Sequence, residues 1–244
     1  MGELIAVLSG KGGTGKTSVC AAVASALAES KEKVLCIDCD IGLRNLDIAL
    51  GLQSTAELSF LEVCRGNVAL SDAPAHPQYP SMQFLTAPMH CQASAVAAKE
   101  FESLLQQARQ QFDYVLIDAP AGIEAGFSLA ARYADRILLV TAADPASIRD
   151  ARRAADVLEL MGKTNIRLIV NRINKKMITA MRMTVDDIMD QAGLGLLGVI
   201  PDDANVTLAA AFEKPLLCYT CKGAAAACKR IARRIMGLHV PITL

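Results

Sequence analysis

The stretch SGKGGTGKT, residues 9–17, stands between the apolar run ELIAVL (3–8) and an alanine-rich segment (15–29) whose composition predicts a helix. It satisfies the pattern G-x-x-x-x-G-K-[ST], which a chain of this length contains by chance about once in a hundred cases. Glycines in such a loop let backbone N–H groups converge on phosphate oxygens at the start of a helix. We therefore expect a phosphate-binding loop in which Lys16 reaches the β- and γ-phosphates and the Thr17 hydroxyl holds Mg²⁺.

Acidic residues follow two other apolar runs. Asp38 and Asp40 end KVLCIDCD (33–40), and Asp118 closes the apolar part of FDYVLIDAP (112–120). Ligands of an open α/β sheet bind beyond the carboxyl ends of its strands, so we expect these carboxylates near the phosphate loop. There they would position the metal and the water that a phosphate-cleaving site needs.

The loop contains a second lysine, Lys11, which a single bound nucleotide does not require. Lys11 comes too early to duplicate Lys16, and the neighbouring glycines give it room to point outward. A cation placed there could reach phosphates held by a facing copy of the protein.

Continuous apolar strands alternate with helix patterns along the chain, which indicates parallel β-α-β units covered by helices on both faces. The expected strands are 3–8, 33–40, 82–88, 112–120, 136–142, 167–173 and 196–201. The expected helices are 15–29, 95–110, 145–161, 184–191, 206–212 and about 223–236. No Ser/Gly/Pro linker divides the chain, and residues 67–80, with three prolines, predict an irregular surface excursion. We expect one domain over residues 1–244, a doubly wound, mostly parallel α/β sheet.

The composition excludes several classes of protein. Hydrophobic residues make up 52% of the 244 residues and charged residues 20%, which is typical of a folded domain with a sizeable core. The 25 basic and 25 acidic residues cancel, so the net charge gives no reason to expect a specific nucleic-acid partner. No apolar run approaches the ~18 residues of a membrane span, and the chain opens directly on a strand pattern. We expect a cytoplasmic protein.

The chain has eight cysteines, which a reducing cytosol favours as small buried hydrophobes. Five lie among apolar neighbours: Cys20, Cys36, Cys39, Cys64 and Cys91. Within a strand, Cys36 and Cys39 point to opposite faces, which argues against a shared metal. Cys218 and Cys221 form a second C-x-x-C pair in a loop-like stretch, but no further pair or histidine set completes four ligands.

The loop KGGTGKT (11–17) resembles the deviant Walker A motif of the ParA/MinD class of P-loop ATPases. In that class the early lysine contacts the nucleotide of the other subunit in an ATP-sandwich dimer. The likeness covers essentially the whole chain. DCDIGLRNLDIALGL (38–52) resembles switch I, and DAPAGIEAG (118–126) resembles Walker B and switch II. VNRI (170–173) and GVIPDD (198–203) resemble the adenine-side loops, and IARRIMGLHVP (231–241) resembles the end of the domain. DIGLRNLD points to the MinD branch rather than to partition proteins or arsenical-pump ATPases.

The resemblance implies a slow, Mg²⁺-dependent ATP hydrolase that dimerises with ATP and is stimulated by dimerisation and by partners. The implied catalytic residues are Lys11, Lys16, Asp40 and Asp118. Lys11 would act in the partner's active site like an arginine finger, and Asp40 would orient the attacking water.

The implied metal ligands are Thr17, Asp38 and Asp118. The implied contacts with ATP or ADP are Gly10, Lys11, Gly12, Gly13, Thr14, Gly15, Lys16, Thr17 and Ser18 at the phosphates, and Asn171, Arg172, Pro201 and Asp203 at the adenine. Asn45 and Asp47 would belong to a switch that orders when ATP is present.

The implied process is the selection of the cell-division site, with a homodimer in the ATP state, a MinC-like division inhibitor and an activating partner. The segment SIRDARR (147–153) departs from the family, because Arg152 stands where an acidic residue is common on the surface that binds MinC. Such a charge reversal can cost several kcal/mol across an interface.

Family members carry a C-terminal amphipathic helix that targets the inner face of the membrane. The chain ends at Leu244, where the linker to that helix would begin, so we expect its peripheral membrane association to be weak. Its last helix has a basic side, formed by Lys229, Arg230, Arg233 and Arg234. We expect that side to be solvated while Cys228, Ile231 and Ile235 pack against the domain.

Three alternatives use the same loop. A ParA-like DNA-segregating ATPase would need a large basic patch. A flagellar or pilus placement ATPase cannot be separated by sequence from one that selects the division site. An iron–sulfur carrier scaffold of the Mrp type would share a cluster through C-x-x-C, but there the pair precedes the equivalent of GVIP (198–201), whereas Cys218 and Cys221 follow it.

Overall fold

Eight strands form one sheet in the computed structural model, which describes residues 1–41, 43–53, 58–88 and 97–243. The strands are β1 (Glu3–Leu8), β2 (Val34–Asp38), β3 (Ala75–His76), β4 (Tyr79–Leu85), β5 (Tyr114–Asp118), β6 (Arg136–Ala142), β7 (Ile166–Ile173) and β8 (Leu196–Pro201). Their order is β3-β4-β2-β5-β1-β6-β7-β8. All neighbouring pairs are parallel except β3 with β4. The strand before the phosphate loop, β1, therefore lies near the middle of the sheet.

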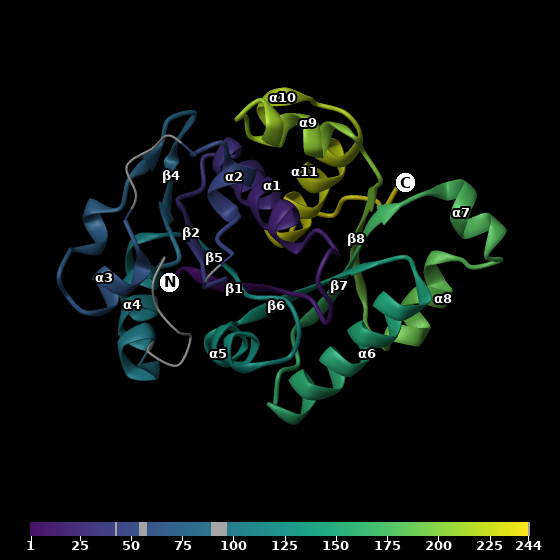
Figure 1. Ribbon diagram of the computed structural model, residues 1–244, viewed down its shortest axis with the longest axis horizontal. Coiled ribbons are helices and arrows are strands. Elements are labelled where there is room, and N and C mark those ends of the chain that lie inside the picture. The colour runs from purple at the N-terminus through teal and green to yellow at the C-terminus, as the bar shows by residue number, and fades with distance from the viewer. Residues whose placement is uncertain (42, 54–57, 89–96, 244) are drawn as a thin grey trace.

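Helices cover both faces of this sheet, as Figure 1 shows. They are α1 (Lys16–Glu29), α2 (Leu46–Leu50), α3 (Phe60–Cys64), α4 (Ala98–Gln111), α5 (Ala125–Tyr133), α6 (Pro145–Leu160), α7 (Lys175–Ala180), α8 (Val185–Ala192), α9 (Asn205–Ala211), α10 (Leu216–Tyr219) and α11 (Gly223–Ile235). One core joins α1, α2, α9, α10 and α11 to one face, and a second joins α3 to α6 to the other. The predicted doubly wound, mostly parallel sheet is confirmed.

Helix α1 is buried nearly all round because it lies between the sheet, α2 and α11. Its sequence, KTSVCAAVASALAE, suits that place, since small and apolar side chains on every side permit close packing in two directions. The first turn of α1, which follows the phosphate loop, is thus fixed by the core.

The long predicted elements agree with the observed ones to within a few residues at each end. The sequence did not reveal the short helices α2, α3, α7 and α10, nor α5. The expectation of an irregular excursion over residues 67–80 was correct only in part. That segment forms a 3₁₀ helix (Leu70–Asp72), strand β3 and the start of β4. Pro74 and Pro77 flank β3, and Pro80 stands in β4 ahead of Met82, where the register with β2 begins, so none of the three interrupts that pairing.

Helix α11 has the orientation that its pattern predicts. Cys228, Ile231 and Ile235 are buried against the sheet and α1. On its polar side, Lys229 pairs with Glu29 at 2.7 Å, and the guanidinium of Arg234 donates to the carbonyl oxygens of Leu197, Val240 and Pro241. The isoleucines of this helix are therefore part of the core.

The cysteines behave largely as small buried side chains. Cys36 belongs to the core on the α1 side of the sheet and Cys39 to the core on the other side, as predicted. Cys218 and Cys221 are exposed, and the Cys218 sulfur lies 3.0 Å from the Tyr79 hydroxyl. Among the described residues no group of three or more His, Cys, Asp or Glu side chains could hold a metal ion. Cys91 lies outside the described residues.

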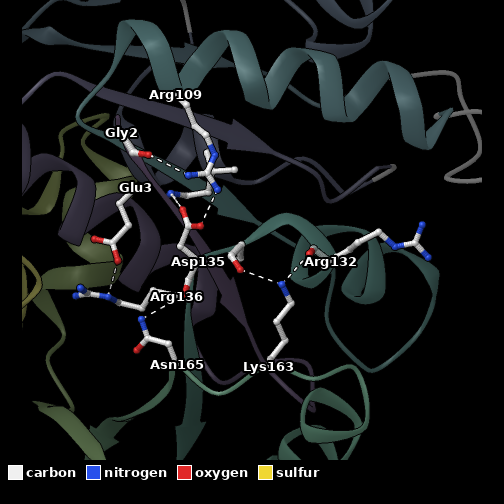
Figure 2. A network of polar contacts seen from close by, with 10 residues as sticks. Gly2, Glu3, Arg109, Arg132, Asp135, Arg136, Lys163 and Asn165 are labelled. Carbon is white, nitrogen blue, oxygen red and sulfur yellow. Dashed lines mark hydrogen bonds and ion pairs between the residues drawn. The ribbon is translucent and has the colours of Figure 1, made fainter.

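A polar network joins the starts of β1 and β6, at the end of these strands opposite the phosphate loop. Figure 2 shows its side chains. Asp135 accepts hydrogen bonds from the Leu4 amide at 2.9 Å and from the Arg109 guanidinium at 2.7 Å. Beside it, Arg136 pairs with Glu3 at 2.8 Å. These contacts tie α4, β1 and β6 together at the amino-terminal ends of the strands, where no ligand is expected.

Candidate functional site

The loop between β1 and α1 has a backbone that only glycine adopts easily at its last position. Gly15 has φ = 83° and precedes α1, where no side chain caps the helix. A Cβ on Gly15 would collide with the amide nitrogen of Asn171, and one on Gly10 with the carbonyl oxygen of Asp150 in α6. The first N–H groups of α1 are therefore free to bind an anion at the positive end of the helix dipole.

The most buried ion pair of the site joins Lys16 to Asp118. The Lys16 ammonium lies 2.7 Å from Asp118 Oδ1, and the two side chains are 6% and 1% exposed. Burial raises the pKa of Asp118, and Lys16 and then the Thr17 hydroxyl oppose that rise. The other oxygen, Asp118 Oδ2, is buried and has no hydrogen-bond partner among the residues that the structure describes. A buried carboxylate oxygen left open in this way suits a metal ion or a water bound to one.

Asp38 stands beside Asp118, since the two are direct partners in the register of β2 and β5. Its oxygens accept hydrogen bonds from the amides of Asp40, at 2.9 Å, and Leu46, at 3.2 Å. Burial first, and then the negative charge of Asp118, raise the pKa of Asp38 to about 7. Two carboxylates held together in the interior favour a cation between or near them.

Asp40 lies just beyond the end of β2 and is partly buried. Burial raises its pKa, and Lys16 opposes the rise. The side chain lines a cavity of about 360 Å³ whose floor is the phosphate loop. Other predicted residues in the lining are Lys11, Gly12, Gly13, Thr14, Gly15, Lys16, Thr17, Ser18 and Asn45. Asp47 does not line it, and instead pairs with Arg44 at 3.2 Å.

Lys11 differs from Lys16 in its surroundings. Its side chain is 45% exposed, and its ammonium lies 3.9 Å from Asp144 Oδ1. Asp144 is the N-cap of α6 and also accepts from the amide and hydroxyl of Ser147. The Lys11 ammonium is thus held loosely at the rim, by a carboxylate that has other partners. Asp144 is a site residue that was not predicted, although the dipeptide Asp-Pro before a helix pattern is a signal for such a capping position.

A second cavity, of about 310 Å³, adjoins the first at Gly15 and Ser18. Its lining includes all four of the residues expected at adenine: Asn171, Arg172, Pro201 and Asp203. Asn171 donates to the Thr14 carbonyl at 2.8 Å, and Arg172 donates to that of Gly13 at 3.3 Å. Both side chains therefore connect β7 to the phosphate loop.

The carboxylate of Asp203 accepts hydrogen bonds from the backbone of the protein itself. One of its oxygens accepts from the Asn205 amide and the other from the Ala224 amide, each at 2.9 Å. These bonds hold the start of α9 against the start of α11. Asp203 thus forms part of the cavity wall, and both of its carboxylate oxygens already accept hydrogen bonds from the protein backbone.

Arg152, the charge reversal noted in the sequence, pairs with Asp156 at 2.7 Å on the exposed side of α6. Within the described part of the chain, no helix is long and apolar enough to cross a membrane.

A mostly parallel sheet, a glycine loop before a buried helix, and a buried lysine–aspartate pair define a P-loop nucleotide-binding protein. Residues 5–216 match the family described as the CobQ/CobB/MinD/ParA nucleotide binding domain. The septum site-determining protein MinD of Synechocystis is 36% identical over 244 residues, which cover 99% of this chain and 92% of that protein. The chain belongs to this nucleotide-binding family and, within it, to the MinD septum site-determining proteins.

Solved structures agree with that assignment. The MinC:MinD cell division protein complex of Aquifex aeolicus contains a chain that superposes with a TM-score of 0.91 at 35% identity, covering 99% of both chains. The septum site-determining protein MinD of Pyrococcus horikoshii, complexed with Mg-ADP, gives a TM-score of 0.84 at 27% identity and covers 96% of both chains. The predicted family and fold are confirmed, and the Mg-ADP bound by that relative agrees with the predicted cofactors.

Proposed function

We propose that residues 1–244 form a single ATPase domain that dimerises when it binds ATP and Mg²⁺, and that hydrolysis resets the dimer. The observation that carries this proposal is the contrast between the two lysines of the loop. Lys16 is buried against Asp118, where it serves its own site, whereas Lys11 is half exposed at the rim and pairs with Asp144 at 3.9 Å. A cation in that place can serve a nucleotide held by a facing copy.

The nucleotide would occupy both cavities. The phosphates would lie on the loop residues Gly10 to Ser18, held by backbone N–H groups and by Lys16. The base would lie against Asn171, Arg172 and Pro201, with Asp203 shaping the pocket through the wall that it stabilises. The relative with bound Mg-ADP supports this choice of ligand.

The residues present also fit a magnesium ion. Thr17 supplies a hydroxyl, Asp118 an oxygen that accepts no hydrogen bond from the described part of the chain, and Asp38 a second carboxylate beside it. Magnesium typically takes one or two carboxylates together with phosphate oxygens, and neutralises charge on the phosphates when bound. Asp38, whose oxygens already accept two backbone hydrogen bonds, would act mainly through water.

Asp40 would orient the attacking water, because its carboxylate is partly buried, close to Lys16 and directed to the phosphate cavity. Lys11 would enter the facing copy's site and neutralise charge that develops on the transferred phosphoryl group. Catalysis would then need two copies, so we expect a slow basal rate that dimerisation and partners raise.

In the cell, we infer a role in selecting the division site. The relatives named above are septum site-determining proteins, and one was solved as a MinC:MinD complex. We therefore propose a MinC-like inhibitor and an activating protein as partners, with peripheral contact to the inner face of the membrane. A flagellar, pilus or partition role would use the same ATP cycle, and the identity of the partner separates these processes.

An iron–sulfur scaffold is disfavoured, because Cys218 lies against Tyr79 and no cluster of metal ligands surrounds it in the described residues.

The rate of ATP hydrolysis at several protein concentrations tests the proposal. If Lys11 acts across a dimer, the rate per molecule rises with protein concentration until the dimer saturates. Lys16→Ala protein, which lacks the phosphate-binding lysine, is the inactive control. A rate per molecule that is independent of concentration over the whole range would contradict catalysis across a dimer.

A further inference from the structure

Helix α7 projects away from the sheet beyond the end of β7, on the side of the molecule where β1 passes into the phosphate loop (Figure 1). It is short, and Ile178 alone in it is buried, in the core that α7 shares with α8 and β7. Met177 and Met181, by contrast, are 59% and 36% exposed. Two large apolar side chains on a protruding helix are candidates for contact with another protein surface.

A cavity of about 300 Å³ connects these methionines to the phosphate loop. Met177, Ile178 and Met181 line one side of it, and Lys11, Gly12 and Gly13 line another. The lysine that we assign to a facing copy and the exposed face of α7 thus border the same hollow. A surface that brings Lys11 to a second copy must bring α7 there also.

The order of the strands indicates which part of the second copy α7 would meet. The phosphate loop follows β1, while β6 and β7 lie on one side of β1, and β5 and β2 on the other. A two-fold axis that passes between the facing phosphate loops and runs perpendicular to the row of strands sets the β7 side of one copy opposite the β5 side of the other, and we take that axis for the dimer. The loop that follows β5 carries Ile123, which is 45% exposed.

Charge agrees with this pairing. Lys175, Lys176 and Arg182 are exposed on or beside α7, whereas Glu124 is exposed next to Ile123. Opposite charges at the rim of an interface steer association and fix its register. The two surfaces are therefore complementary both in apolar side chains and in sign.

We propose that the methionine face of α7 packs on the β5–α5 loop, around Ile123, of a second copy of this chain in the ATP-bound dimer. The inference rests on the proposed ATP-dependent dimer and adds a contact outside the nucleotide site. By symmetry the contact forms twice. It links the order of the loop that follows Asp118 to the presence of the other subunit, since a buried apolar contact holds that loop in one place.

Methionine oxidation measures this contact directly. Asp40→Ala protein, which we expect to hold ATP without hydrolysing it, is exposed to dilute hydrogen peroxide with ATP·Mg²⁺ or with ADP·Mg²⁺. Mass spectrometry then gives the rate of sulfoxide formation at each methionine. Burial in the dimer should slow oxidation of Met177 and Met181 about fivefold or more with ATP, because oxidation follows exposure. Met1, which is fully exposed, serves as the internal control and should oxidise equally in both states.

A matched pair of variants separates this contact from dimerisation in general. The double variant Met177→Glu/Met181→Glu should raise the dissociation constant of the ATP-bound dimer about tenfold or more, since it places charge in an apolar contact. Leu160→Glu alters an apolar residue that is even more exposed, at 89%, at the C-terminal end of α6, and should leave the dimer unchanged. Both variants change exposed side chains, so the thermal midpoint should stay near that of the unaltered protein.

The outcomes are distinct. Oxidation of Met177 and Met181 that is equally fast in a dimer confirmed by light scattering would overturn the α7 contact and leave the dimer standing. A protein that stays monomeric with bound ATP would overturn the proposed function, and the α7 contact with it. Equal weakening by the double variant and by Leu160→Glu would likewise show that α7 has no special place in the interface.

Discussion

The ammonium of Lys16 lies 2.7 Å from Oδ1 of Asp118, although 102 residues separate the two in sequence. Both side chains are buried, so each compensates a charge that the interior would otherwise leave unpaired. The same lysine is the one that the loop pattern assigns to the phosphates. Stability and nucleotide binding therefore depend on one side chain.

Replacing Lys16 by Ala should impair both properties. The buried charge of Asp118 loses its partner, and such a loss costs about 3–5 kcal/mol of the free energy of unfolding. ATP binding should fall because the point charge at the β- and γ-phosphates is gone. Urea unfolding measures the first effect, and titration with a fluorescent ATP analogue measures the second. Unchanged stability would contradict the buried ion pair.

Replacing Lys11 by Ala should leave stability and ATP binding largely intact and should impair hydrolysis. Its pair with Asp144 is half exposed and long, so its loss should change the free energy of unfolding by no more than about 1 kcal/mol. Much of the ATP binding should remain, while hydrolysis should fall by about 10³-fold or more if Lys11 acts like an arginine finger. Equal loss of ATP binding in the Lys11 and Lys16 variants would show that Lys11 serves its own subunit's nucleotide.

The close approach of the phosphate loop to α6 gives a prediction about two glycines. In Gly10→Ala the new Cβ would overlap the carbonyl oxygen of Asp150, so the loop or the helix must move. We expect a loss of about 1–3 kcal/mol in the free energy of unfolding, as for other overpacked sites. In the control, Gly12→Ala, the nearest described atom to the new Cβ would be the Ala121 Cβ at 3.9 Å, and stability should hardly change. Equal denaturant midpoints for the two variants would show that the loop does not rest on α6.

His76 makes folding sensitive to pH. Its Nδ1 accepts from the Gln78 amide at 3.1 Å, so its Nε2 carries the hydrogen that it donates to the Leu50 carbonyl at 2.8 Å. Burial lowers the pKa of His76 from its ordinary value of 6.5, and the bond to Leu50 only partly offsets this. The folded state thus prefers neutral histidine. Its contribution to stability is complete above pH 6.5 and is lost as the pH falls below that value.

Urea unfolding at pH 7.5 and pH 5.5 tests this sign. The unaltered protein should lose more stability on acidification than His76→Gln protein, by at most about 1.4 kcal/mol per pH unit for one proton. His239→Gln, in which an exposed histidine is replaced, is the control and should behave like the unaltered protein. A larger acid loss in His76→Gln would reverse the assignment.

Sequence predicted the elements that depend on long local patterns. Strands such as β6 (Arg136–Ala142) are continuous apolar runs, and the loop before α1 has a spacing that few other structures require. Helices α2, α3, α7 and α10 escaped prediction because four to six residues are too few to show a helical period. Such short helices form because the core accepts their apolar residues, as it accepts Ile178 of α7.

The site shows the same division. The pattern placed Lys16 and Thr17 in the loop, and the strand ends placed Asp38 and Asp118 nearby. That Asp38 and Asp118 are register partners follows from strand pairing, which no local pattern encodes. The pairing of Lys11 with Asp144, and the commitment of Asp203 to two backbone amides, likewise depend on how distant segments meet.

The state of association with each nucleotide tests the central claim most directly. Asp40→Ala protein should bind ATP·Mg²⁺ without hydrolysing it, since the residue assigned to orient the water is missing. Light scattering should then give twice the monomer mass with ATP·Mg²⁺ and the monomer mass with ADP·Mg²⁺. A protein that demonstrably holds ATP yet keeps the monomer mass at high concentration would contradict the ATP-bound dimer and the role given to Lys11.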